Sequence, residues 1–163
     1  MVESVRTPEC QTLHEALVEN GIFQLVTTIW GVRNSTVDLL AVDHNPSDPS
    51  FYGKAYEHRR GTVWCVDVTT QIIHDKLHKE FLQAIVLHEV GHCDHYAAAW
   101  GNPGLRALLE NLQDREFYAD DFVVKHGYSR ELRRTITRQR DISLGKRKPF
   151  SAINEARLQR LLQ

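Results

Sequence analysis

The stretch LQAIVLHEVGHCDHY, residues 82–96, joins a strongly apolar run to a group of polar residues and decides the interpretation of the chain. Within it, His88, Glu89 and His92 form the pattern H-E-x-x-H. Residues four apart on a helix lie one above the other on the same face, so His88 and His92 present two imidazoles to a common point. The apolar residues before them predict a half-buried helix, where polar side chains without partners are costly. The stretch therefore predicts a metal site on a helix.

Zinc suits this pair of histidines, because its nitrogen ligands lie at about 2.0–2.1 Å from the ion. Glu89 stands one step round the helix, where it would reach a water on the metal rather than the metal itself. Zinc lowers the pKa of such a water, and the carboxylate takes its proton. Gly91 costs about 1 kcal/mol in a helix interior, which predicts close packing beside the site. The pattern therefore predicts a catalytic zinc with Glu89 as general base.

A catalytic zinc needs a third protein ligand and an open fourth position. The metzincin extension of the motif would place glycine at position 95 and histidine at position 98, but this chain has His95 and Ala98. The next predicted helix carries Glu116 and Asp120, four apart on one face, and the turn GNPG can fold it back. We expect Glu116 to close the site and Asp120 to accept a hydrogen bond from a ligand histidine. Weaker candidates for the ligand position are Asp94, His95, Glu110 and Asp121.

HEVGH at 88–92, followed by EFYAD at 116–120, resembles the gluzincin metallopeptidases. Within that clan the pattern is most similar to the HtpX-type peptidases and their small soluble relatives, the minigluzincins, and the similarity covers residues 79–128. The resemblance implies a zincin-like fold with His88, His92 and Glu116 as zinc ligands. It also implies Glu89 as the catalytic base and Asp120 as the partner of a ligand histidine. The chain departs from the membrane members of the family in lacking spanning helices, and the segment from His92 to Glu116 is short.

The remaining sequence predicts one α+β domain over residues 1–163, with a small antiparallel or mixed sheet packed on the H-E-x-x-H helix and the helices after it. Apolar periodicity and capping residues predict helices at 8–20, 79–99, 105–126, from Ser129 onward, and at 151–162. Runs rich in β-branched and aromatic residues predict strands at 22–30, 36–42 and 62–69. Asn, Pro and Ser predict a loop at 43–50, and Gly127 is expected to end the helix before it.

Two further features are expected if the chain is a peptidase: a strand that binds the substrate and a residue that stabilises the oxyanion. The strand at 62–69 precedes the motif helix, and we expect an extended peptide to add to it through main-chain hydrogen bonds, as on the edge strand of zincins. A residue that stabilises the oxyanion is also expected, because such donors are usual where charge develops in acyl transfer. Candidates by residue type are Tyr118, His126, Tyr128 and His95.

Composition and charge exclude several classes of protein. The 163 residues have a net charge of −1, which argues against nucleic acid as a partner. No apolar run reaches the roughly 18 residues of a membrane span. The N-terminal stretch lacks an apolar leader and the chain has three irregularly spaced cysteines, so we expect a cytoplasmic location. Basic residues cluster in the last third, which predicts a solvated helix face or a surface for an acidic partner: Arg130, Arg133, Arg134, Arg138, Arg140, Lys146, Arg147 and Lys148.

The sequence as a whole predicts a zinc-dependent endopeptidase that hydrolyses peptide bonds through a water activated by Glu89. One alternative is a regulatory protease of the ImmA/IrrE type that cleaves a repressor, although the asparagine usual in that type is Asp120 here. The other alternative is a zinc-bearing pseudoenzyme that binds peptides. Glu89 argues against a purely structural zinc, because a structural site needs no base.

Overall fold

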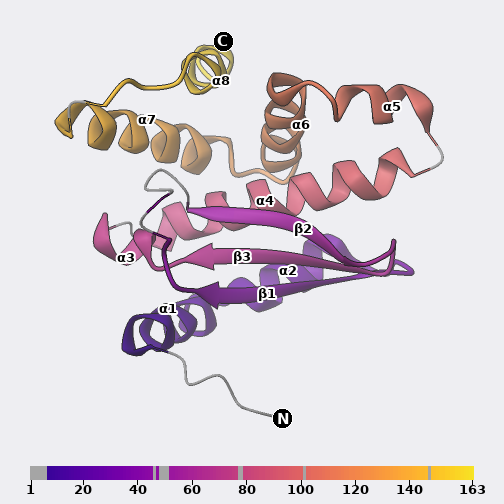
Figure 1. Cartoon of the computed structure of the whole chain (residues 1–163), viewed down its shortest axis with the longest axis horizontal. Coiled ribbons are helices and arrows are strands. Elements are labelled where there is room, and N and C mark those ends of the chain that lie inside the picture. Colours follow the sequence, from indigo (N-terminus) through magenta and orange to yellow (C-terminus); the bar gives the residue numbers. More distant parts are fainter. Residues whose placement is uncertain (1–6, 46, 48–51, 77–78, 101, 147) are drawn as a thin grey trace.

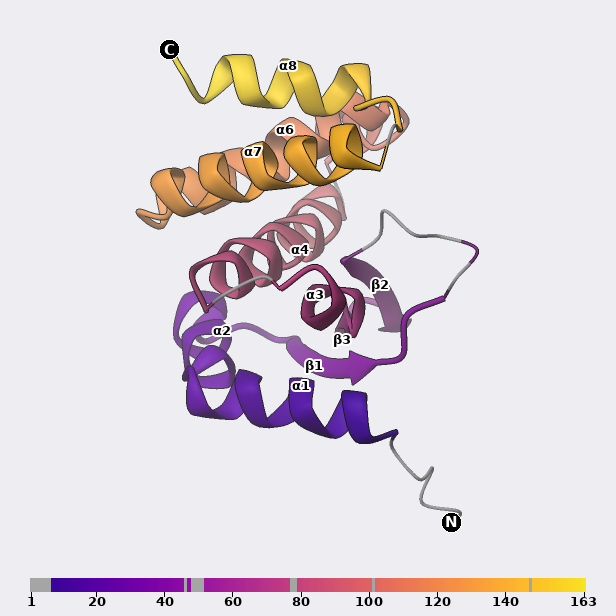
Figure 2. The same cartoon turned by 90° about the vertical axis from the view of Figure 1, so that its left-hand side faces the viewer.

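Helix α4 (Lys79–Ala99) runs through the middle of the molecule, between a small sheet and the helices that follow it in the chain (Figures 1 and 2). The computed structural model describes residues 7–45, 47, 52–76, 79–100, 102–146 and 148–163. These residues form eight helices and one three-stranded sheet, so the α+β class predicted from the sequence is confirmed.

The sheet is mixed and has the strand order β1-β3-β2. Strand β1 (Thr36–Val42) pairs in parallel with β3 (Val63–Thr69), and β2 (Gly53–Arg59) pairs with the other side of β3 in antiparallel fashion. The central strand β3 coincides with the strand predicted at 62–69. Because β3 is paired on both sides, it offers no free edge to a peptide, and the expectation of peptide addition to this strand is wrong. Strand β2 lies at the edge of the sheet next to β3 and pairs with β3 through one side, so its other side is a free edge among the described strands.

Helices α1 (Pro8–Glu19) and α2 (Ile22–Trp30) pack against the sheet beside α4. The prediction of a strand at 22–30 is wrong. Its β-branched and aromatic residues favour a strand by propensity, but Ile22, Val26 and Trp30 are four apart and all three are buried, as on the inner face of a helix. Tertiary packing therefore overrides local propensity in this segment.

Two elements have no counterpart among the predictions. Strand β2 reads GKAYEHR, a polar and charged sequence that lacks the expected enrichment in β-branched residues. Charged side chains are normal on an edge strand, where they discourage pairing with other chains. The other element is the single turn of helix α3 (Gln71–His74), directly after β3.

The segment after α4 contains two helices instead of the one predicted at 105–126. Helix α5 (Pro103–Leu108) is capped by Asn102, and α6 (Leu112–Lys125) is capped by Asn111, whose side chain accepts hydrogen bonds from the main chain of its first turn. Gly127 has a φ of +89° just beyond α6, which confirms its expected place at a helix end. Helix α7 (Ser129–Gly145) and helix α8 (Ala152–Arg160) complete the chain. Ser129 does not cap α7, because the cap position is Tyr128.

Helix α4 is buried on two sides and has an apolar core against each. One core lies between α4, the sheet, α1 and α2, and includes Val66, Val68 and Val86. The other lies between α4 and the C-terminal helices, and includes Leu87 and Leu132. A helix that is apolar around most of its circumference is a central helix. The polar residues of the H-E-x-x-H pattern are therefore fixed on the most buried element of the fold.

Several predictions fall at the edge of the described residues. The described part of the loop predicted at 43–50 contains neither helix nor strand, and residues 46 and 48–50 lie outside the described residues. Residues 1–6, the first glycine of GNPG and residue 147 lie outside them as well. Within the described part of the chain, no helix is both long and apolar enough to cross a membrane.

Candidate metal centre

Gly91 allows α4 and α6 to approach closely enough to form the site. A Cβ atom at this position would lie 2.9 Å from the Cα and 3.0 Å from the carbonyl oxygen of Ala119 on α6. Any other residue would force the two helices apart, because these atoms belong to the backbone. The expected close packing at Gly91 is thus confirmed, and its consequence is that α6 can bring Glu116 to the histidines of α4.

Glu116 lies between the two histidines of the pattern. Its Oε2 is 3.1 Å from Nε2 of His88, and its Oε1 is 3.4 Å from Nε2 of His92. One ligand atom from each of these residues lies within 4.8 Å of the others, so the group could hold a metal ion. Two ligands at about 2.0–2.1 Å from a tetrahedral zinc are about 3.3–3.4 Å apart. The donor types and spacings of the three residues therefore fit zinc.

Asp120 orients His88 from the side opposite to Glu116. Its Oδ1 lies 3.0 Å from Nδ1 of His88, and its side chain is almost fully buried. A hydrogen bond from Nδ1–H to this carboxylate directs the other ring nitrogen, Nε2, toward Glu116. Partners of this kind fix the tautomer and the ring orientation of ligand histidines. The structure therefore gives Asp120 the position expected from the sequence.

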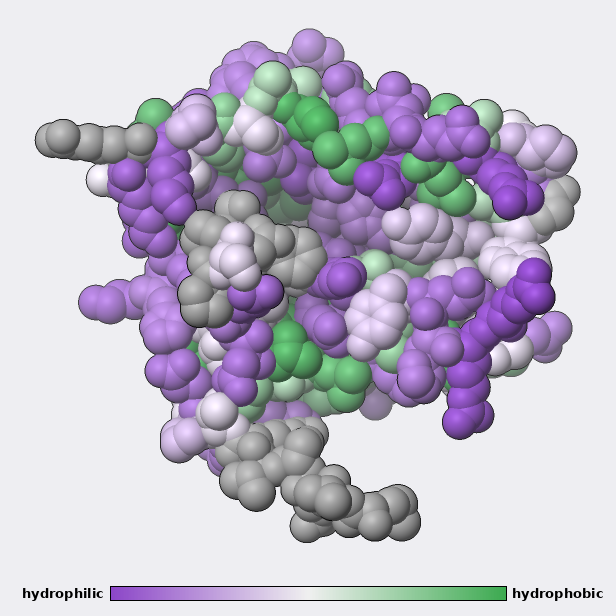
Figure 3. Space-filling view, viewed as in Figure 1, coloured by the Kyte–Doolittle hydropathy of each residue, from purple (hydrophilic) through white to green (hydrophobic). Residues whose placement is uncertain are grey.

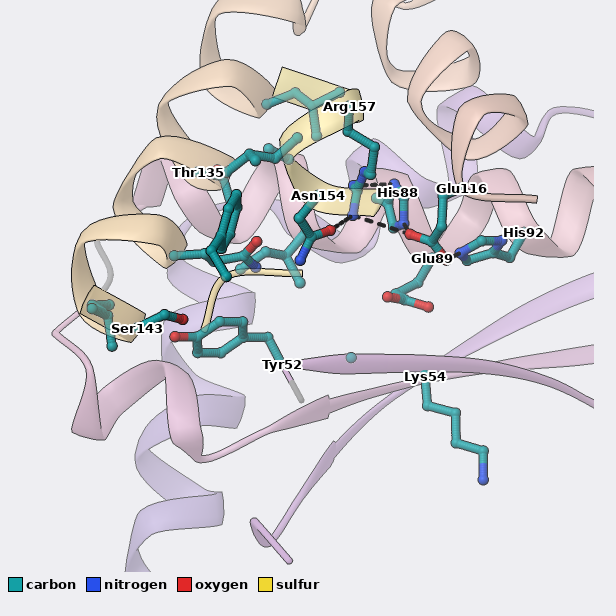
Figure 4. A pocket seen from close by; sticks show the side chains of 18 of the residues that line it. Tyr52, Lys54, His88, Glu89, His92, Glu116, Thr135, Ser143, Asn154 and Arg157 are labelled. Carbon is teal, nitrogen blue, oxygen red and sulfur yellow. Dashed lines mark hydrogen bonds and ion pairs between the residues drawn. The ribbon is translucent and has the colours of Figure 1, made fainter. Parts of the chain in front are cut away.

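Arg157, from the C-terminal helix α8, was not anticipated at this site. Its Nε and Nη2 bind the two oxygens of Asp120 at 2.9 and 2.8 Å. Its Nη1 lies 3.0 Å from Oε2 of Glu116 (Figure 4). Nη2 also lies 3.2 Å from Nδ1 of His88. Both Nη2 of Arg157 and Nδ1 of His88 carry a proton when His88 is oriented by Asp120. We therefore assign Oδ1 of Asp120 as the acceptor for both nitrogens. The buried guanidinium therefore pairs with two carboxylates, that of Asp120 behind His88 and that of the candidate ligand Glu116.

These contacts move the pKa values of the buried groups. Burial and Arg157 lower the pKa of His88, but hydrogen bonds to Asp120 and Glu116 outweigh them and raise it to about 9. Burial raises the pKa of Glu116, but hydrogen bonds from His88 and His92 and the charge of Arg157 hold it far below its usual range. The pKa of Asp120 is also lowered, by His88 and Arg157 against burial. Without metal, His88 is therefore protonated at neutral pH, and a metal ion must displace that proton.

Glu89 lies beside the ligand group, on the side nearer the sheet (Figure 4). A Cβ atom at Gly53 would lie 2.8 Å from its Cγ, so strand β2 passes directly against Glu89. Both residues line a pocket of about 370 Å³ that His88, His92 and Glu116 also line. The base expected from the sequence, the candidate ligands and the free edge of the sheet therefore share one cavity. The surrounding face is mostly hydrophilic, and hydrophobic residues show on it only as separate patches (Figure 3).

The residues proposed by type to stabilise an oxyanion lie elsewhere. Tyr118 donates a hydrogen bond to Asp94 at 2.9 Å and stacks on His95 with ring centroids 4.0 Å apart. His126 packs on Phe122. None of the four candidates, Tyr118, His126, Tyr128 and His95, is among the described residues that line the pocket. Residue type alone was a poor guide, because these side chains leave α4, α6 and the turn after α6 in other directions.

The weaker candidates for the third ligand are also accounted for. Asp94 pairs with Arg33 at 2.6 Å, and Asp121 pairs with Arg160 at 2.7 Å. Glu110 is exposed, and His95 is fully buried against Tyr118. Among the described residues, the potential metal ligands that meet within 4.8 Å are those of the group His88, His92 and Glu116. The three cysteines are buried, as expected of small core residues.

Comparisons with known proteins give no further identification. No protein family model matches the chain, and no curated protein or solved structure gives a significant match.

Proposed function

We propose that this chain is a zinc-dependent endopeptidase of the gluzincin type, with a zincin-like arrangement of its active site. One observation carries the proposal: His88, His92 and Glu116 converge, and Glu89 stands beside them in the same pocket. Three protein ligands with an adjacent carboxylate are typical of a catalytic zinc, whereas structural zinc sites use four protein ligands. Asp120 supports the proposal, because it orients His88 as an outer partner does in such sites.

In this proposal each residue of the site has a defined task. Zinc, when bound, lowers the pKa of a water and polarises the carbonyl of the peptide. Glu89 takes the proton from the attacking water and passes it to the leaving amine. Arg157 and Asp120 hold His88 and Glu116 in position, so that the ligands need little rearrangement. Preorganised groups of this kind lower the barrier because they need not reorient during the reaction.

The peptide substrate would bind along β2. This strand pairs with β3 through one side only, and Gly53, Lys54 and Ala55 line the pocket beside Glu89. An extended peptide can add to a free edge through main-chain hydrogen bonds, with pockets that select alternate side chains. The lack of a side chain at Gly53 supports this placement, because it lets the strand pass close to Glu89.

Two substitutions test the proposal together with a zinc measurement. Glu89→Gln is expected to retain one zinc per chain and to lose chelator-sensitive cleavage of unfolded casein. His88→Ala is expected to lose both zinc and cleavage. Stoichiometric zinc with unchanged hydrolysis in His88→Ala would overturn the proposal. An inactive wild type that binds peptides with zinc retained would instead favour the pseudoenzyme.

A further inference from the structure

The pocket continues well beyond the metal centre, between α7 and the start of β2. From His92 and Glu89 it extends past Asn154 and Thr135 to Ser143 and Tyr52 (Figure 4). Its walls in this direction are largely apolar and include Ile85, Leu132, Ile136 and Phe150. The cavity therefore has room for a part of the substrate that lies to one side of the cleaved bond.

A network of polar side chains lies at the far end of the pocket. Asp75 accepts hydrogen bonds from the hydroxyl of Tyr52 at 2.6 Å and from Nε2 of Gln71 at 2.8 Å, and it pairs with Nζ of Lys146 at 3.1 Å. Burial opposes ionisation of Asp75, but these three donors outweigh it and lower its pKa. The network connects the end of α3 to the end of α7.

This end of the pocket carries excess positive charge. Lys146 and Lys148 both line the pocket, and Asp75 pairs with Lys146. Asp75 is already bound to Tyr52, Gln71 and Lys146. No carboxylate within the described part of the chain forms an ion pair with Lys148. An anionic group of a ligand would therefore meet an available ammonium group at the end of an apolar cavity.

The direction of β2 determines which part of a peptide reaches this end. The strand runs from Gly53, next to Tyr52, to Arg59 at the hairpin (Figure 1). Antiparallel pairing is slightly more stable per residue than parallel pairing. A peptide antiparallel to β2 would place the residues that follow the cleaved bond on the side of Tyr52, Lys146 and Lys148.

We propose that Lys148 selects peptides that carry a carboxylate shortly after the cleaved bond, beyond an apolar residue held by Ile85, Leu132 and Ile136. The carboxylate is either an acidic side chain or the C-terminus of the peptide, since both present the same chemistry. This inference rests on the proposed function for the position of the cleaved bond. The recognition of a peptide carboxylate by the pocket does not depend on hydrolysis.

Binding is measured on zinc-loaded Glu89→Gln protein, so that peptides are not consumed. Four labelled peptides share the sequence up to a leucine after the cleaved position. The residue after the leucine differs. The first peptide ends in amidated aspartate and has a side-chain carboxylate, and the second ends in asparagine with a free C-terminal carboxylate. The third ends in amidated asparagine and is neutral at this residue, and the fourth ends in amidated lysine and is positively charged there. Fluorescence anisotropy gives Kd at low and high salt. We expect at least one peptide with a carboxylate to bind about 1.5–5-fold more tightly than the neutral peptide at low salt, and the comparison of the first two peptides identifies the source of that carboxylate.

Substitutions of Lys148 show whether this residue causes the preference. The preference is expected to disappear in Lys148→Ala, to reverse toward the lysine peptide in Lys148→Glu, and to persist in the matched control Lys125→Ala, an exposed lysine outside the pocket. Equal affinities for the four peptides, or a preference that survives Lys148→Ala, would overturn the inference. If the wild type cleaves peptides but shows no preference for a carboxylate, the inference fails and the proposed function stands. If a preference that depends on Lys148 is found but no cleavage, the proposed function fails and the inference stands.

Discussion

Replacement of Arg157 by methionine tests whether the candidate metal centre depends on the C-terminal helix. Arg157 is 7% exposed, and its guanidinium binds both oxygens of Asp120, which is 1% exposed. It also pairs with Glu116 at 3.0 Å. Methionine keeps the length and apolar contacts of the arginine stem but removes the cation that Asp120 and Glu116 share. In the metal-free protein, the two buried carboxylates are then left with one protonated His88 between them, and His92 as a further partner of Glu116.

The cost of this change follows from burial. Removing one partner of a buried ion pair typically destabilises a protein by about 3–5 kcal/mol, because the remaining charge stays desolvated. Helix α8 offers a matched control three residues further on, where Arg160 also binds both oxygens of an aspartate, Asp121. That pair has side chains 40% and 60% exposed, and pairs at the surface contribute about 1 kcal/mol or less. The two arginine substitutions should therefore differ by at least about 2 kcal/mol.

The assay is urea unfolding of chelator-treated protein at pH 7, followed by circular dichroism. Arg157→Met is expected to lower the free energy of unfolding by about 3–5 kcal/mol, and Arg160→Met by about 1 kcal/mol or less, with equal urea dependence in both. The double variant Asp120→Asn with Arg157→Met should lose less than the sum of its single variants, because it leaves no unpaired charge. Equal losses in Arg157→Met and Arg160→Met would refute the view that the site is stabilised by a buried cation.

Three further predictions concern α4, β2 and the titration of the site. Gly91→Ala should push α6 away from α4, with a loss of about 2 kcal/mol or more in unfolding free energy and much weaker zinc binding, measured by urea unfolding and chelator competition. In Gly53→Ala the added methyl group would press on the flexible side chain of Glu89, so casein cleavage should fall while the zinc content stays at one per chain. Full activity of this variant would contradict the proposal that β2 lies beside the catalytic base. The pKa of His88 is raised to about 9, so its contribution to metal-free stability is fully present below about 6.5 and is lost as the pH rises through 9. Zinc affinity should rise over the same pH range, because His88 must lose its proton to bind the metal. Binding at pH 7.5 should therefore release a proton, which calorimetry in two buffers of different ionisation enthalpy detects.

The ligands could be predicted from sequence because their spacing is local. His88 and His92 are four apart on one helix, and Glu116 and Asp120 are four apart on another, so helical periodicity alone places each pair on one face. The only long-range assumption is that the two helices meet, for which the turn GNPG is the evidence in the sequence, while Gly91 predicts only close packing beside the site.

Arg157 could not be predicted in the same way. It lies 69 residues from His88 and 37 from Asp120 in the sequence. An arginine in an amphipathic helix is usually exposed, and nothing in the adjacent sequence distinguishes Arg157 from the exposed Arg160. Strand β2 could not be predicted for a similar reason, because it is polar and gains its strand conformation from pairing with β3.

X-ray absorption at the zinc K-edge, on protein loaded with one equivalent of zinc, tests whether His88, His92 and Glu116 bind one ion together. A site of these three residues gives two imidazole nitrogens at about 2.0–2.1 Å with oxygen ligands completing the shell, and it loses its zinc in Glu116→Ala. A sulfur ligand at about 2.3 Å, or an unchanged spectrum with full zinc content in Glu116→Ala, would contradict it.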